Sequence, residues 1–172
     1  MSNKLSETSL FSAQQDQATK YVPEYNIALS TFERVRAMFP GLVMNLDLHP
    51  LHVELELAMD IPTQPGLLFN VHLNLQNGDE LHLNAPGFWV EWFPCTKPER
   101  VEKYYEAVSE LLSGRFRILQ HCRGTRVVKA SLQCPTGGRW KTITSCWHLW
   151  SFPWPPKTFK VVQNLPPVQP LR

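Results

Sequence analysis

The chain has 172 residues, of which 43% are apolar and 19% charged, and its formal net charge at pH 7 is +2. This balance is typical of a globular domain and excludes a chain that is disordered throughout. No apolar run approaches the ~20 residues needed to cross a bilayer, so the sequence predicts no membrane-spanning helix.

The first 20 residues are polar and offer little to bury, so we expect residues 1–20 to form a mobile N-terminal arm. They contain no apolar stretch of signal-peptide length, which favours a cytoplasmic protein. In that compartment the four cysteines, which show no C-x-x-C spacing, are expected to be reduced thiols; they are Cys95, Cys122, Cys134 and Cys146. A zinc site made of these cysteines is the less favoured alternative.

The single domain that we expect over residues 21–152 begins with a helix. Between about Pro23 and Phe39, apolar residues recur at the spacing of one helical face, and Pro40-Gly41 follows. A regular alternation of apolar and polar residues over 51–59 then predicts a half-buried strand, and residues 42–48 fit a strand before it.

Residues 70–84, NVHLNLQNGDELHLN, predict a β-hairpin around an Asn-Gly pair. A two-residue turn would mix apolar and polar side chains on each face, so we expect a three-residue loop. A loop over 76–78 pairs His72 directly with His82, whereas a three-residue loop shifted by one position places them diagonally. In both registers the two histidines share the polar face of the sheet.

A second helix is predicted from about residue 97 to residue 113, after a further strand in FWVEWF (88–93). The evidence for this helix is a stripe of apolar residues at helical spacing. Thr96 followed by Glu99 matches a capping box, Pro98 suits the first turn, and Gly114 is the expected stop.

Three strands are predicted next, over 115–121, 126–134 and 139–150. A two-residue loop at Gly137-Gly138 would pair Leu132 with Ile143 and Val128 with Trp147, which places the tryptophan on the apolar face. The sequence leaves the turn near Arg123-Gly124 open; if Gly124 ends a three-residue loop, Arg117 lies opposite Lys129 on the polar face.

The last 20 residues, 153–172, form a proline-rich tail that we expect to be extended and to pack through Trp154 and Phe159. The whole chain therefore has the order α-β-β-β-(β)-α-β-β-β. This order predicts an α+β fold, with an antiparallel sheet of about six strands and two helices on one face.

Charge is divided unevenly along the chain. Residues 1–96 hold four Lys or Arg and eleven Asp or Glu, whereas ten basic residues and no acidic side chain follow Glu110. Acidic strands of the same sheet could neutralise the basic ones, or the acidic half of a second copy could do so. Otherwise the basic half is free to hold a polyanion.

We therefore expect a binding or assembly protein rather than an enzyme, one that self-associates or binds another protein through a basic, Trp-rich C-terminal sheet. The candidate partner-binding residues are Arg117, Arg123, Arg126, Lys129, Arg139, Lys141 and Trp140. Single-stranded nucleic acid is an alternative partner, because cations hold phosphates and aromatic rings stack on bases.

A small metal-dependent enzyme is the other alternative. His72, His82 and His52 could hold a divalent metal if the strand at 51–59 lies beside the hairpin. The favoured interpretation of these histidines is an ordinary solvated sheet face. Because the sequence has no phosphate-binding loop and no nucleophile elbow, we expect no cofactor and assign no catalytic residue.

Overall fold

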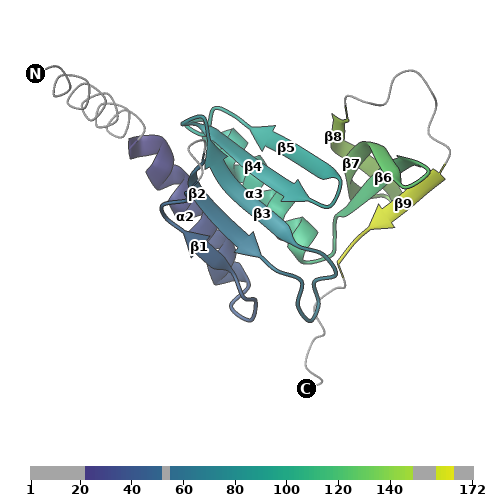
Figure 1. Ribbon diagram of the computed structural model, residues 1–172, viewed down its shortest axis with the longest axis horizontal. Helices are drawn as coiled ribbons and strands as arrows, with labels where there is room; N and C mark the ends of the chain where they lie inside the picture. Colours follow the sequence, from purple (N-terminus) through teal and green to yellow (C-terminus); the bar gives the residue numbers. More distant parts are fainter. Residues whose placement is uncertain (1–21, 52–54, 149–157, 165–172) are drawn as a thin grey trace, which may run out of the picture.

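The computed structural model describes residues 22–51, 55–148 and 158–164 (Figure 1). These residues form two helices and nine antiparallel strands, labelled as in Figure 1, which confirms the α+β class and the approximate element order. The strands divide into sheets of five and four, rather than forming the single sheet of about six that we expected. The predicted N-terminal arm, His52 and Trp154 lie outside the described residues.

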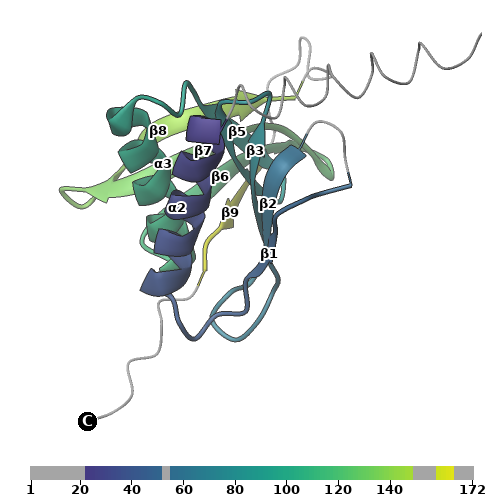
Figure 2. The same ribbon diagram turned by 90° about the vertical axis from the view of Figure 1, so that its left-hand side faces the viewer.

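The five-stranded sheet is an antiparallel meander in chain order: β1 (Asn45–Asp47), β2 (Leu55–Ile61), β3 (Val71–Gln76), β4 (Glu80–Ala85) and β5 (Phe88–Trp92). Two helices, α2 (Val22–Met38) and α3 (Pro98–Leu112), lie side by side on one face of it, as expected (Figure 2).

The main core lies between these helices and the sheet. Alternation sends the apolar side chains of β2, β3 and β4 to the helix side, where Leu57, Leu73 and Leu83 are almost completely buried. The rings of Phe32 and Tyr104 stack between the helices, with centroids 6.4 Å apart. Each such buried side chain contributes about 1.5–3 kcal/mol of transfer free energy, so this layer dominates stability.

Helix α3 begins one residue later than the capping box requires, and that prediction is wrong. Pro98 takes the first helical position, where its fixed φ is suitable and its missing N–H has no intrahelical partner to lose. The cap therefore falls on Lys97, whose side chain has no acceptor and makes no capping hydrogen bond. The stop at Gly114 is as predicted, with φ +75°.

The hairpin of β3 and β4 has a three-residue loop over 77–79, because Gln76 pairs with Glu80. Asn77 and Gly78 adopt φ 53° and 83°, the left-handed region that asparagine and glycine tolerate best. The direct pairing of His72 with His82 is therefore wrong, and the diagonal arrangement is the one observed.

The four-stranded sheet stands beside β5, with the order β8-β7-β6-β9 (Figure 1). Its strands are β6 (Arg117–Arg123), β7 (Arg126–Thr136), β8 (Arg139–Trp147) and β9 (Thr158–Val162). Its inner face adds Ile118, Ala130 and Leu132 to the core. The edge strand β9 comes from the segment for which the sequence indicated only an extended tail.

A close contact at Gly87 joins the two sheets. This glycine lies in the β4–β5 turn with φ +65°, and a Cβ there would be 2.9 Å from both Gln120 Nε2 and Val127 Cγ2. Gln120 also donates a hydrogen bond from Nε2 to the carbonyl of Pro86 at 2.5 Å. The turn therefore packs directly on the inner face of the four-stranded sheet.

Two bulges change the predicted registers of the four-stranded sheet. The Gly137-Gly138 turn is confirmed, but a bulge beside Leu132 shifts the pairing by one residue, so that Trp147 pairs with Lys129 rather than with Val128. Because side chains alternate, this shift moves the tryptophan to the face opposite the one predicted.

The β6–β7 hairpin differs from the three-residue loop considered above in its turn as well as in a bulge. Arg123 pairs with Arg126 across a two-residue turn, and a bulge beside His121 follows. Arg117 consequently lies opposite Gln133 rather than opposite Lys129.

Candidate functional site

The face of the four-stranded sheet that points away from the core carries both cations and exposed rings. We call it the outer face and define it by Arg117, His121, Lys129, Trp140, Trp147 and Phe159, which share one side by strand register. Trp147 is 69% exposed and Phe159 65% exposed, whereas the inner-face residues Ile118 and Leu132 are fully buried. Contiguous exposed apolar surface of this kind often marks an interaction site.

Cations and rings are paired on the outer face. The guanidinium carbon of Arg117 lies 3.9 Å from the centroid of the Trp140 ring, and its Nε donates a hydrogen bond to Gln133 Oε1 at 3.0 Å. The ammonium nitrogen of Lys129 lies 4.6 Å from the centroid of the Trp147 ring. Each exposed pair contributes about 0.5–1 kcal/mol and holds a positive charge beside an aromatic surface.

The outer face stays positive at neutral pH. Burial lowers the pKa of Arg117, but a guanidinium titrates far above neutral pH and remains charged. His121 packs edge-on against Phe159, with ring centroids 5.0 Å apart. Burial, and after it the charge of Lys129, lowers the pKa of His121, which favours the neutral imidazole.

No acidic side chain belongs to the four-stranded sheet, because the sequence has none after Glu110. The strands that carry acidic residues lie in the other sheet, where β2 pairs with β1 and β3. Neutralisation by acidic strands of the same sheet is therefore ruled out. Arg115, which precedes β6, does bind an acid, since it forms a bidentate pair with Glu110.

The other predicted partner-binding residues are divided between two sides. Arg123 and Arg126 form a cross-strand pair at one end of the sheet, on the side of the outer face by alternation. Arg139 and Lys141 flank Trp140 on β8 and therefore project from the opposite side. The sequence analysis expected Phe159 to pack the tail against the domain, whereas it lies in β9 and is 65% exposed. The alternation of TFKVV between proline-rich segments is the signal that could have indicated this strand.

The two histidines of the β3–β4 hairpin, His72 and His82, lie on the polar face of the five-stranded sheet, away from the helices. His72 is exposed, and its Nδ1 lies 2.5 Å from Asp60 Oδ1. His82 is only 1% exposed, and its Nε2 lies 3.1 Å from Glu80 Oε2. The two histidines thus have different acidic neighbours.

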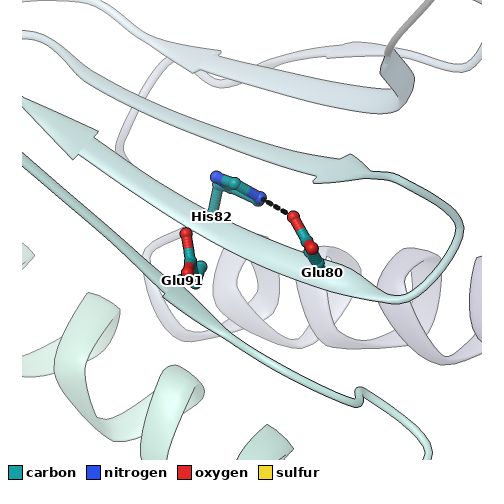
Figure 3. A group of neighbouring side chains, drawn as sticks. All are labelled: Glu80, His82 and Glu91. Carbon is teal, nitrogen blue, oxygen red and sulfur yellow. Dashed lines mark hydrogen bonds and ion pairs between the residues drawn. The ribbon is translucent and has the colours of Figure 1, made fainter.

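A different group of side chains gathers around His82 (Figure 3). Glu80, two residues before it on β4, and Glu91, its cross-strand partner on β5, each place a carboxylate oxygen within 4.8 Å of an imidazole nitrogen and of each other. Trp89 lies next to this group, with its ring centroid 5.3 Å from that of His82. Sequence reasoning missed both glutamates, although alternation in FWVEW places Trp89 and Glu91 on one face.

Comparisons with protein-family models, with curated proteins and with solved structures found no match to this chain. Neither α2 nor α3, the two helices of the described residues, is long and apolar enough to cross a membrane.

Proposed function

We propose that this is a binding protein that holds single-stranded nucleic acid on the outer face of its four-stranded sheet. The observation that carries the proposal is the pairing of Arg117 with Trp140 and of Lys129 with Trp147 on one exposed face. Rings that stack on bases and adjacent cations that contact phosphates are the two components of single-strand recognition.

The single-stranded form is favoured because its bases are accessible. In a duplex the flat faces of the bases are stacked on each other, so Trp147 and Phe159 would gain little from them. Their exposed rings, 69% and 65% of whose surface is open, offer stacking surfaces that a single strand can use. The lack of any carboxylate in β6–β9 removes the repulsion that a phosphate backbone would otherwise meet.

A second copy of the chain is the other partner that charge supports. Its acidic side chains include Asp60 on the five-stranded sheet and Glu33 on α2, which are both exposed. These side chains could contact the outer face of another copy. A cytoplasmic location belongs to the same proposal, because all four cysteines are free and reduced thiols are usual in that compartment.

The proposal is tested by fluorescence anisotropy with a labelled single-stranded oligonucleotide of ~20 nucleotides, longer than the ~4–16 that one small domain covers. We expect binding at low salt, and Trp147→Ala should weaken it roughly 5- to 150-fold, since base stacking contributes about 1–3 kcal/mol per base. Lys129→Ala should lower the salt dependence by about 0.7 in the slope of log K against log salt.

Two matched variants serve as controls. Trp89→Ala removes a tryptophan that is 45% exposed but lies on the other sheet, and Arg36→Ala removes an exposed cation of α2 that is paired with Glu33. Both should bind like the wild type. An unchanged anisotropy at low salt, or equal losses in the Trp147 and Trp89 variants, would exclude the outer face as the nucleic-acid surface.

A further inference from the structure

We infer that Glu80, His82 and Glu91 form a binding site for one divalent transition-metal ion on the polar face of the five-stranded sheet. This site is on a different sheet from the outer face and does not depend on the proposed nucleic-acid binding. The three side chains already place one ligand atom each within 4.8 Å of one another (Figure 3).

Two buried polar atoms without a partner in the described residues lie on the same sheet face as this group. His82 Nδ1 and Asn74 Oδ1 have no hydrogen-bond partner among the described residues, although the residues are only 1% and 7% exposed. Asn74 lies directly opposite His82 in the β3–β4 register, so both side chains are on one face. Buried polar atoms in a folded protein normally have a partner, and an ion or water bound beside them is one way to supply it.

The hydrogen bonds around the group orient its ligands. Glu80 Oε2 lies 3.1 Å from His82 Nε2 and accepts a second hydrogen bond from Asn77 Nδ2 at 2.8 Å. An ion bound by both Glu80 Oε2 and His82 Nε2 would take the place of the hydrogen bond between them, and the imidazole proton would then be on Nδ1.

A third carboxylate adds negative charge close by. Glu56 accepts a hydrogen bond from the amide of Gly78 through Oε1, while its Oε2 is buried without a partner in the described residues. Burial is the main cause that raises the pKa of Glu56, and the charge of Glu80 raises it further. A cation between these strands would relieve the repulsion.

The ligand types indicate the kind of ion. An imidazole together with carboxylates suits Mn²⁺, Fe²⁺ or Zn²⁺, whereas Ca²⁺ and Mg²⁺ prefer sites made only of oxygen atoms. Three protein ligands also leave coordination positions open for water or a small anion.

The test is a titration of the full chain with Mn²⁺ after dialysis against a chelator, with bound ion measured by electron paramagnetic resonance. Mn²⁺ is used because the four free cysteines could capture Zn²⁺. We expect one bound ion per chain and an increase in melting temperature. A Glu80→Gln, Glu91→Gln variant should lose affinity about 10- to 100-fold or more.

Glu99→Gln is the matched control, because it removes an exposed carboxylate in the first turn of α3. It should bind Mn²⁺ like the wild type. If circular dichroism shows that the double variant is unfolded, the single Glu91→Gln variant replaces it. A folded wild type that binds no Mn²⁺, or folded variants that bind it as tightly as the wild type, would overturn the inference.

Discussion

His121 on the outer face lies between an aromatic ring and a cation. Its ring packs edge-on against Phe159 from β9, and Lys129 is its cross-strand partner on β7. Burial and the nearby positive charge both disfavour the imidazolium, so the pKa of His121 lies below its usual value of 6.5.

This arrangement predicts a pH dependence with a definite sign. The unfolded chain binds the proton with the higher pKa, so the contribution of His121 to stability is complete above about pH 6.5 and is lost as pH falls through the lower, folded pKa. NMR titration should give a pKa below 6.5, and Lys129→Ala should raise it. Lys97→Ala, at the cap of α3, should leave it unchanged; a wild-type pKa at or above 6.5 would contradict the prediction.

Besides its pairing with β6, strand β9 is held in place by Gln163 and Asn164, the two residues that follow it. Asn164 is 2% exposed; it accepts a hydrogen bond from the amide of Leu68 at 2.9 Å and donates one to the carbonyl of Leu111 at 3.1 Å. Gln163 donates to the carbonyl of Gly114 at 2.7 Å. These contacts tie β9 to the end of α3 and to the β2–β3 connection.

Removing the amide of Asn164 should therefore destabilise the whole protein. Asn164→Ala leaves the Leu68 amide and the Leu111 carbonyl without this partner, and we expect the free energy of unfolding to fall by about 1–3 kcal/mol. Urea unfolding followed by circular dichroism measures it. Thr158→Ala, at the exposed start of β9, should change it by less than about 0.5 kcal/mol. Equal urea midpoints for the two variants would show that the hydrogen bonds of Asn164 do not stabilise the fold in this way.

The molecule as a whole separates its charges in space. The basic strands form their own sheet beside β5 (Figure 1). By strand register, Asp60, Glu80 and Glu91 lie on the five-stranded sheet. Two copies could therefore associate with the outer face of one against the acidic half of the other. Such contacts are screened by salt, since the Debye length falls from about 10 Å at 0.1 M to about 3 Å at 1 M.

We accordingly expect the protein to self-associate at low salt and to be a monomer at about 1 M salt. Sedimentation velocity measures the association state. An oligonucleotide that occupies the outer face should reduce the association at low salt, because both partners use the same cations. An Arg117→Ala, Lys129→Ala variant should remain monomeric, whereas Arg36→Ala should behave like the wild type. A sedimentation coefficient that does not vary with salt or protein concentration would contradict this expectation.

The sequence by itself determined the local elements. The spacing of apolar residues and the residue types at turns were sufficient to predict both helices, the Gly137-Gly138 turn and the α+β class. These features depend on residues that are close together in the chain. It also determined the excess of basic residues after Glu110.

Only the tertiary structure decided which faces these elements present. A bulge beside Leu132 makes Trp147 the cross-strand partner of Lys129. The loop over 77–79 in the β3–β4 hairpin places His72 and His82 diagonally rather than opposite each other. Glu91 joined His82 through strand pairing that local periodicity does not specify. The physical reason is the two-residue period of a strand: a register shift of one residue reverses every side chain, and packing of distant segments sets that register.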